Sequence, residues 1–512
     1  MSKIKAEKTV PDNPVQRSRA AEIAGTLESL IITFALVLAW RAFVMEAYRI
    51  PTGSMAETLM GAHFFLRCSQ CGYKYDYGFV PERYGLPQDV IPSGSVREVT
   101  SRCPNCGHYQ PVGGTMPISN GDRILVLKCI YQFFEPKQWD IVVFKDPREP
   151  TINLIKRLVG RQGETVEIID GDVYIDGRIS RKPPRVQNEM WMPVYDNDYQ
   201  PARPREGLFN GHPWQQPFKN IANSKWETGK GGAAQFRLTS PIGEVHTLIY
   251  DSSLGNDFRA TYAYNDVGGN SYLPYCSDLM MRFYAASGGL DGIIGIGLSK
   301  YQTHYKAWVD YSGRMVIAKV SQEGTETVLD SKTLEIPALG KPVLVKFANV
   351  DHQLIFEFGG EKLVYDLGRS PDDAGPRETN VEPQVKIFGC GQLTLSHIGV
   401  FRDVHYTSRK FANRDDSGRA IEGNPLTLGK DEFFMLGDNS PNSEDGRWWE
   451  QAGRGNNKIF YRKGIVPRDY LVGKAMFVYW PGGFKPFAQF PVAAIPNVGR
   501  MRFIYGGSDR KL

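Results

Sequence analysis

The sequence lacks several features that would place it in a special class of protein. It has no excess of charge of one sign, since 61 lysines and arginines stand against 56 aspartates and glutamates. This balance argues against a nucleic acid partner. There is no low-complexity tract, which excludes a mostly disordered chain, and no repeat of fixed period, which argues against a propeller or a solenoid. With 512 residues, of which 41% are hydrophobic, we expect two or three folded domains.

Long apolar runs are scarce, and only one is long enough to cross a membrane. It covers residues 23–44 and carries charges only at Glu28 and Arg41. A helix of this length would reach roughly 33 Å, which suffices for a hydrocarbon layer of about 30 Å. A buried core helix and a cleaved secretion signal are the alternatives. No Ala-x-Ala cleavage pattern follows the run, which favours a retained anchor.

The flanks of the run indicate its orientation. Basic residues are frequent before it, whereas residues 46–66 contain only one, Arg49. The positive-inside rule then places the N-terminal tail, residues 1–22, in the cytoplasm and the rest of the chain beyond the membrane. The bases of the tail are Lys3, Lys5, Lys8, Arg17 and Arg19.

Most of the chain has the pattern of short β-strands. The segments RILVLK, WDIVVF, INLIKRLV, TVEII and GKAMFVYW are short and β-branched, and IIDGDVYIDG has the Asp-Gly pairs of a hairpin. The long block of residues 188–407 contains many short alternating runs, which predicts an antiparallel sandwich.

A serine stands on a loop directly after the apolar run. The segment RIPTGSM places Ser54 between a glycine and a methionine, with Pro51 restricting the backbone. Such a loop can turn a hydroxyl and an amide toward one point. Taken alone, the same pattern is typical of a solvated turn.

Lys156 lies in the expected strand INLIKRLV. Because side chains alternate along a strand, Lys156 shares one face with Ile152, Leu154 and Leu158. Burial among aliphatic side chains lowers the pKa of a lysine from about 10.4 by as much as roughly 3 to 5 units, so that its amine can act as a base. An edge-strand lysine extending into water is the alternative.

Four segments behind the apolar run resemble, in their order, the signature boxes of the type I signal peptidases. They are RIPTGSM, GDRILVLK from Gly121, KRLVGRQGE from Lys156 and GDNSPNSEDGR from Gly437. Read from its residues alone, the last segment is a tight polar turn. The resemblance covers the apolar run and a β-stranded catalytic domain, but not two insertions. The chain departs from the family at Glu57, where a proline is usual, and this departure concerns the stiffness of the loop.

The resemblance implies a serine endopeptidase that needs no cofactor for catalysis. Ser54 would be the nucleophile, Lys156 the general base, and the Ser54 amide with the Thr52 hydroxyl the oxyanion pocket. No histidine lies in the four boxes, which favours a Ser/Lys dyad over a Ser/His/Asp triad. The supporting residues that the family implies are Ser443 and Asp445, which orient the lysine, Asp438 and Arg447 in the same loop, and Met55 close to substrate and membrane.

The same resemblance implies substrates, partners and a location. The substrates would be secretory preproteins with small residues at the first and third positions before the cut, bound as an added strand at a sheet edge. The other partners would be the lipid bilayer and nearby secretion machinery. The location would be the bacterial cytoplasmic membrane, crossed once, with the catalytic domain on its outer face.

Four cysteines form two Cys-x-x-Cys-Gly pairs. Cys68 and Cys71 make the first pair, and Cys103 and Cys106 the second. Paired knuckles of this kind hold a structural Zn²⁺ through four thiolates, as in a zinc ribbon. The oxidising side of a membrane favours two disulfides instead. The glycine after each pair makes zinc our prediction, and four sulfur ligands leave no open position for catalysis.

The block of residues 188–407 is the second insertion. Its strand pattern and tryptophans resemble concanavalin-like or laminin-G-like sandwiches, which would give it a glycan or cell-wall ligand. Its aromatic residues also fit an ordinary core. The expected division is 1–22 tail, 23–44 anchor, 45–66 first catalytic segment, 67–111 zinc-ribbon-like insertion, 112–187 lysine segment, 188–407 sandwich insertion and 408–512 last catalytic segment.

Two other functions compete with the peptidase. One is a different Ser/Lys hydrolase on the same fold, such as a self-cleaving repressor, but those relatives have no anchor. The other is a binding or scaffold protein whose peptidase core has lost its activity. Since every reacting residue is present, the sequence favours an active signal peptidase.

Overall fold

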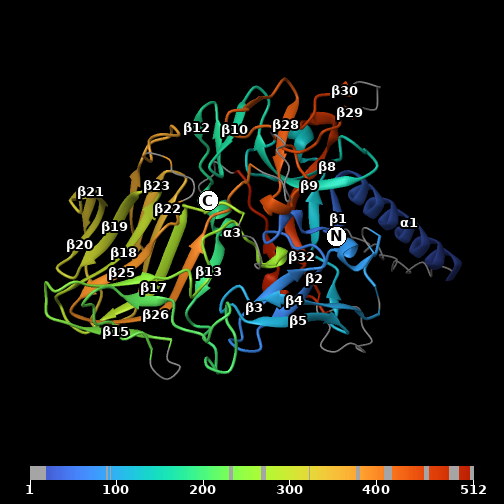
Figure 1. The fold of residues 1–512 in the computed structure, drawn as a ribbon. Coiled ribbons are helices and arrows are strands. Elements are labelled where there is room, and N and C mark those ends of the chain that lie inside the picture. Colours follow the sequence, from blue (N-terminus) through green and yellow to red (C-terminus); the bar gives the residue numbers. More distant parts are fainter. Residues whose placement is uncertain are drawn as a thin grey trace, which may run out of the picture.

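The structure, a computed structural model, describes residues 19–87, 90–92, 94–229, 234–266, 272–321, 323–375, 377, 381–408, 418–454, 460–483 and 495–507. These residues form mostly β-strands (Figure 1). The helices among them are α1 (Arg19–Phe43), α2 (Ile130–Phe133) and α3 (Pro184–Met190). Of the expected cytoplasmic tail, Lys3, Lys5, Lys8 and Arg17 lie outside the described residues.

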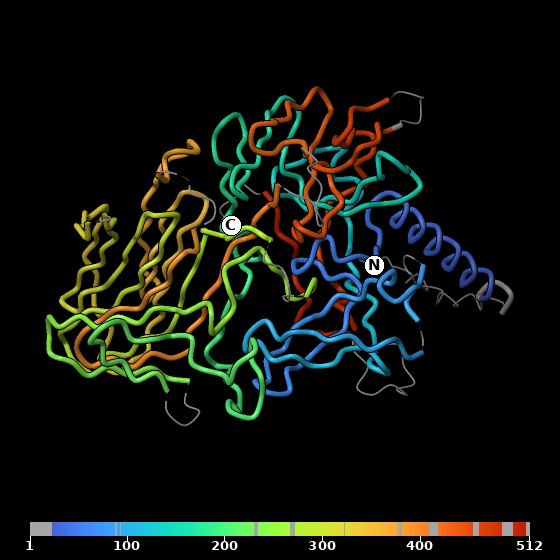
Figure 2. Tube along the Cα trace, in the orientation of Figure 1, coloured from blue at the N-terminus to red at the C-terminus, as the bar shows by residue number. Residues whose placement is uncertain are grey.

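The helix α1 projects from the rest of the molecule (Figures 1 and 2). Residues Ile23–Phe43 are apolar enough to cross a membrane, and none of that stretch is buried against the protein. Ile31 and Phe34 are 69% and 67% exposed. A core helix would have its apolar side chains covered by the protein, so the buried-helix alternative is wrong. The helix is instead a candidate membrane span.

An antiparallel central sheet begins directly after α1. Its first strand, β1, pairs with β7 from Met45 opposite Leu127 to Arg49 opposite Arg123. Four of the strands expected from the β-branched segments therefore lie side by side in one sheet, whereas the fifth, TVEII, belongs to another sheet. In spatial order they are β1 (Met45–Arg49), β7 (Arg123–Leu127), β32 (Leu471–Trp480), β8 (Ile141–Lys145), β9 (Asn153–Gly160), β28 (Glu432–Leu436) and β31 (Val466–Pro467), with β33 (Arg502–Phe503) also beside β32.

A small sheet packs next to the central one and contains the expected hairpin. Asp170 and Gly171 form its turn with φ of 46° and 86°, a left-handed conformation that suits an Asp-Gly pair. The order of the sheet is β12 (Arg178–Ile179), β11 (Asp172–Ile175), β10 (Thr165–Ile169) and β27 (Leu426–Thr427). A separate pair is β29 (Gly453–Arg454) with β30 (Phe460–Tyr461).

The cysteine-containing insertion forms two small sheets around one apolar cluster. Phe64, Leu66 and Val112 are buried there together with the sulfur-bearing residues. The sheets are β3 (Lys74–Gly78), β2 (His63–Arg67) and β6 (Ile118–Ser119), and β4 (Val96–Arg102) with β5 (Tyr109–Gly114).

The large insertion contains two antiparallel sheets that pack face to face, which we call the two-sheet unit (Figure 1). One core unites them, since Phe283 and Phe356 of the first sheet are buried in the same cluster as Ile296 and Ile387 of the second. The first sheet is β13 (Met192–Asp196), β26 (Gln392–Arg402), β17 (Leu279–Ser287), β22 (Val343–Val350), β23 (Gln353–Phe358) and β24 (Glu361–Asp366), with β15 (Phe236–Thr239) also beside β26. The second is β14 (Phe218–Asn220), β16 (His246–Tyr250), β25 (Val385–Cys390), β18 (Ile293–Lys300), β19 (Thr303–Asp310), β20 (Arg314–Val320) and β21 (Glu326–Thr333).

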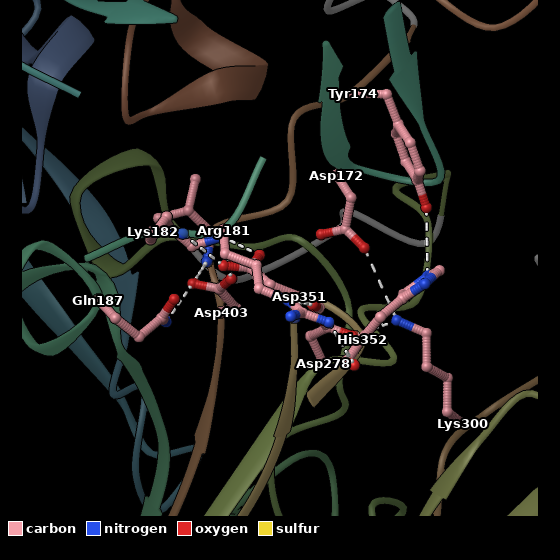
Figure 3. Close-up of polar contacts among 11 residues, drawn as sticks. Asp172, Tyr174, Arg181, Lys182, Gln187, Asp278, Lys300, Asp351, His352 and Asp403 are labelled. Atoms are coloured by element: carbon pink, nitrogen blue, oxygen red, sulfur yellow. Dashed lines mark hydrogen bonds and ion pairs between the residues drawn. The ribbon is translucent and has the colours of Figure 1, made fainter. Parts of the chain in front are cut away.

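A buried cluster of charges joins the two-sheet unit to the small sheet (Figure 3). Lys300 contacts Asp278 of its own unit and lies 3.7 Å from Asp172 in β11. Lys182, which follows β12, contacts Asp351 and lies 2.8 Å from Asp403. All six side chains are at most 9% exposed. The two units are thus held together by ion pairs that water cannot replace.

We expect Lys300→Met to destabilise the protein, because it leaves Asp278 and Asp172 buried without their ammonium. Breaking a buried ion pair in this way costs about 3–5 kcal/mol. Urea-induced unfolding of the detergent-solubilised protein measures the loss. The matched control is Lys306→Met, whose exposed pair with Glu326 should contribute at most about 1 kcal/mol. Equal losses in the two variants would contradict a structural role for the cluster.

Candidate active site

Ser54 lies in a loop, residues 50–62, that we call the serine loop. Asp122 closes the base of this loop: its carboxylate accepts a hydrogen bond from the Met60 amide (2.9 Å), and its carbonyl accepts one from the Ile50 amide (2.8 Å). Asp122 is fully buried. Ser54 itself is half-buried in a single 3₁₀ turn, Gly53–Met55. The loop is therefore held at both ends while Ser54 stays partly exposed.

Met55 does not lie where the sequence led us to expect it. Its side chain is fully buried in a core cluster with Ile50, Leu59 and Ile124. Because it points into the core between the serine loop and β7, it has no surface for substrate or lipid. We expected Met55 close to substrate and membrane, and its burial corrects this expectation. Met55 is an internal support of the serine loop.

Lys156 lies on β9 with its amine beside the Ser54 hydroxyl. The distance from Nζ to Oγ is 2.5 Å, within hydrogen-bond reach. Lys156 stands opposite Val142 of β8, and Leu154 and Leu158 on its own face pack in the apolar cluster that contains Val142. Only 3% of Lys156 is exposed. The apolar face expected from strand alternation is present at Leu154 and Leu158, whereas Ile152 precedes β9 and is 45% exposed. The alternative of a lysine in water is wrong.

The surroundings of Lys156 favour its uncharged form. Burial lowers the pKa of Lys156 to about 8, because a charged amine loses its hydration there. The carboxylate of Asp445 acts in the opposite direction, while the guanidiniums of Arg447 and Arg148 lower the pKa further. At pH 7 roughly a tenth of the amines are then neutral, against less than about one in a thousand for an ordinary lysine.

A second loop, residues 437–447, packs against the serine loop, and we call it the aspartate loop. Asp445 and Arg447 form an ion pair of 2.8 Å in which both side chains are fully buried. Asp445 also accepts a hydrogen bond from the Gly437 amide at 3.0 Å. Burial alone would raise the pKa of Asp445, but the Arg447 guanidinium holds it below its usual value. The loop keeps its carboxylate charged and already paired beside the lysine.

Asp438 ties the aspartate loop to the strand that carries Lys156. Its two carboxylate oxygens accept hydrogen bonds from Arg157 at 2.8 and 2.6 Å, and neither side chain is exposed. Arg157 follows Lys156 in β9, so its side chain lies on the opposite face of the sheet. The pair fixes the register of the loop against the strand while the Arg157 charge stays on the face away from the amine.

Ser443 and Thr52 lie in different surroundings. Ser443 is buried, and within the described residues its Oγ has no hydrogen-bond partner. A Cβ at Gly437 would approach that Oγ to 2.2 Å and the Ser54 carbonyl to 2.5 Å, so only glycine lets the two loops meet here. Thr52 is exposed and directly precedes the 3₁₀ turn that contains Ser54. The Thr52 side chain makes no hydrogen bond to the backbone of that turn.

Glu57 faces a cavity of about 180 Å³ between the serine loop, β3 and the two-sheet unit. Burial, together with Asp76 nearby, raises the pKa of Glu57, although Arg402 and Arg500 oppose the shift. A carboxyl group in place of the family's usual proline thus lies in a polar junction of three parts of the chain.

The four cysteines of the two knuckles meet at one point. Their sulfur atoms all lie within 4.8 Å of one another, with Cys68 and Cys106 3.6 Å apart and Cys71 and Cys103 3.8 Å apart. The two knuckles have the same backbone hydrogen bond. The Gly72 amide donates to the Cys68 carbonyl, and the Gly107 amide donates to the Cys103 carbonyl. None of these cysteines is in a disulfide. Four convergent sulfurs are the donor set that Zn²⁺ prefers.

Sequence reasoning missed several residues that shape the site. Arg157 could have been found from strand alternation, which places it opposite Lys156 as a buried cation that needs a partner. Asp122 follows a glycine in the GDRILVLK segment but gave no local sign of closing the serine loop. Tyr264 and Asn265 of the two-sheet unit contact both loops, and their sequence contained no signal of this.

Two stretches of the chain that contain part of this site match a known protein family. Residues 109–215 and 396–480 match the family model described as signal peptidase, peptidase S26. The match includes Lys156 and the aspartate loop but begins after Ser54, so the position of Ser54 rests on geometry.

Curated relatives give the same result. The chain is 30% identical over 154 residues to Signal peptidase I of Rickettsia typhi (strain ATCC VR-144 / Wilmington), which is 30% of this chain and 43% of the relative. It is 29% identical, with the same shares, to Signal peptidase I of Rickettsia prowazekii (strain Madrid E). The chain thus spans 43% of the length of these relatives. These matches confirm the resemblance to type I signal peptidases that the four boxes indicated.

A solved structure aligns with a different part of the chain. The carbohydrate binding module CBM66 from Bacillus subtilis is 11% identical, with a TM-score of 0.21, over 37% of this chain and 97% of the module. At this TM-score no relationship follows.

Proposed function

We propose that this chain is a membrane-anchored serine endopeptidase that removes signal peptides from secreted preproteins. The observation that carries the proposal is the 2.5 Å distance between Ser54 Oγ and a lysine amine that is 3% exposed. A buried amine in a mostly apolar surrounding, next to the hydroxyl of a half-buried serine, suits acyl transfer by a Ser/Lys dyad. The match to the signal peptidase family model and to the rickettsial relatives supports the choice of substrate.

The geometry suggests the following reaction. The neutral Lys156 amine takes the proton of Ser54 as Oγ attacks the scissile carbonyl, and the Ser54 amide with the Thr52 hydroxyl stabilises the oxyanion. The lysine then returns the proton to the leaving amine as the peptide bond breaks. The same lysine then takes a proton from a water that attacks the acyl-enzyme, and it returns this proton to Ser54 Oγ as the ester bond breaks and the carboxylic acid product leaves. In this scheme Ser443 and Asp445 orient the lysine, and Asp438 and Arg447 support the loop that carries them.

The anchor supports the proposed location. The α1 helix leads directly into β1, whose last residue is five positions before Ser54, so the hydroxyl stays near the end of the span. A translocated signal peptide would emerge from the bilayer at that side. We propose a single pass through the bacterial cytoplasmic membrane, the N-terminus in the cytoplasm and the catalytic part outside, close to the secretion machinery. The seven-part division of the chain stated above is part of the proposal.

The cysteine cluster supports a structural zinc ion. Tetrahedral thiolates at about 2.3 Å from zinc lie about 3.8 Å from one another, close to the 3.6 and 3.8 Å found here. A disulfide needs about 2.05 Å. Cys68, Cys71, Cys103 and Cys106 would hold the metal and fix the fold of residues 67–111. The glycan or cell-wall ligand of the two-sheet unit stays a prediction.

We expect Ser54→Ala and Lys156→Ala each to lower kcat/KM for a preprotein by at least about 1000-fold, because each removes one partner of the proton transfer. Cleavage of the preprotein by the detergent-solubilised chain, followed by gel electrophoresis, measures this. Lys145→Ala, on the neighbouring strand β8, is the matched control and should retain activity. Cleavage that survives either substitution at the dyad contradicts the assignment.

We expect kcat/KM to rise with pH through an apparent pKa of about 8, because only the neutral Lys156 amine accepts the proton. The cation of Arg148 lowers this pKa and the anion of Glu444 raises it. Arg148→Gln should therefore move the acid limb of the profile to higher pH, and Glu444→Gln should move it to lower pH. Shifts in the same direction would show that Lys156 is not the titrating base.

We expect one zinc ion per purified chain, measured by mass spectrometry of the metal content. Cys106→Ser should remove the zinc, because three thiolates bind it far more weakly, while Cys129→Ser should retain it since Cys129 lies outside the cluster. A protein without metal whose four cysteines resist alkylation after denaturation would have disulfides instead.

A further inference from the structure

The two-sheet unit sends one segment into the catalytic part of the molecule. Residues 260–266 leave the unit beyond a neck where the Ala260 amide donates to Pro274 and the Cys276 amide donates to Phe258. The segment then makes a 3₁₀ turn, Ala263–Asn265. In Figures 1 and 2 the green to yellow-green chain of this region reaches the blue chain of the serine loop. We call residues 260–266 the reaching segment.

Tyr264 of the reaching segment supports the serine loop from beneath. Its ring is 2% exposed and packs with Ala56 and Met60. Its hydroxyl donates a hydrogen bond of 2.6 Å to the Ala62 carbonyl. A Cβ at Gly53 would approach the ring to 1.9 Å, so the ring lies directly on the backbone of the residue before Ser54.

Asn265 is hydrogen-bonded to Asn439, which in turn binds the backbone on both sides of Ser54. The amides of Asn265 and Asn439 donate to each other at 2.6 and 2.9 Å. Asn439 also donates from its side chain to the Gly53 carbonyl (2.9 Å) and from its backbone to the Ser54 carbonyl (3.1 Å). Asn265 is 7% exposed, so water does not replace these bonds.

The reaching segment also contacts Asp438 and Asn442 of the aspartate loop. The hydroxyl of Tyr262 donates to the Asp438 carbonyl at 2.8 Å, and Asn442 donates to the Asn265 side chain at 3.3 Å. Three side chains of one insertion thus hold both loops that meet at the Ser54 hydroxyl. A module that only bound a distant ligand would not need these contacts.

We propose that Asn265 and Tyr264 are positioning residues for Ser54, so that the two-sheet unit completes the active site. The inference rests on the proposed peptidase function. Asn265 acts through Asn439 and touches no reacting atom. Because the Lys156 amine is fixed in a packed strand, a shift of the serine loop alone lengthens the distance over which the proton moves, and misplacement by about 1 Å can lower a rate by about 100-fold.

The test is the turnover of Asn265→Ala, with kcat normalised to the folded fraction from thermal unfolding. We expect kcat for a preprotein to fall by about 10- to 100-fold while KM changes by less than roughly twofold. The matched control is Asn349→Ala, a fully buried asparagine that donates to Ser277 within the two-sheet unit and should keep its kcat. If both variants lose activity only in proportion to their folded fraction, the inference is overturned.

A double variant separates positioning from general support. If Asn265 acts through Asn439, then Asn265→Ala combined with Asn439→Ala should lower kcat no more than Asn439→Ala alone. Multiplied losses would overturn the inference. Should Asn265→Ala not fold, Tyr264→Phe retains the ring, loses one hydrogen bond and should lower kcat by about fivefold; an unchanged kcat would again overturn it. Failure of the unaltered chain to cleave the preprotein would instead refute the proposed function.

Discussion

The Lys156 amine can accept a proton only while it is uncharged, and an uncharged lysine near neutral pH needs a site that water does not reach. The apolar face formed by β8 and β9 supplies that site. A pKa near 8 instead of 10.5 means that the charged amine is disfavoured by about 3 kcal/mol. The protein must compensate for this elsewhere, because an unfolded chain would hydrate the same amine freely. The remaining features of the site serve to keep other charges from undoing the effect.

Two buried ion pairs have this role. Asp445 raises the pKa of Lys156, and the Arg447 guanidinium, which engages both oxygens of Asp445, lowers it again. Arg157 lies next to Lys156 in sequence, yet strand alternation and Asp438 keep its charge on the other face. Buried pairs of this kind add little net stability, because desolvation offsets their attraction. Their value here is geometric: the Asp438–Arg157 pair joins the aspartate loop to β9, and the Asp445–Arg447 pair fixes the conformation of the loop itself beside the dyad.

Local patterns in the sequence were sufficient for part of this arrangement. Strand alternation predicted the apolar face around Lys156, and two Cys-x-x-Cys-Gly pairs predicted four convergent sulfurs, because both depend on residues close together in the chain. The partner of Arg157 lies 281 positions away, and the bond between Asn265 and Asn439 spans 174. No periodicity reports such distances. Met55 was misplaced for a similar reason, since a loop residue has no fixed face until its surroundings are known.

The position of the large insertion follows from the same constraint. The chain leaves the catalytic part near Lys182 and returns near Asp403, and these two residues form an ion pair, so the ends of the insertion are held together. A unit attached at one buried point could still rock about it. The reaching segment makes a second attachment, at Asn439 and Ala62. Two separated attachments prevent rocking, and therefore any displacement of the two-sheet unit must move the backbone that carries Ser54.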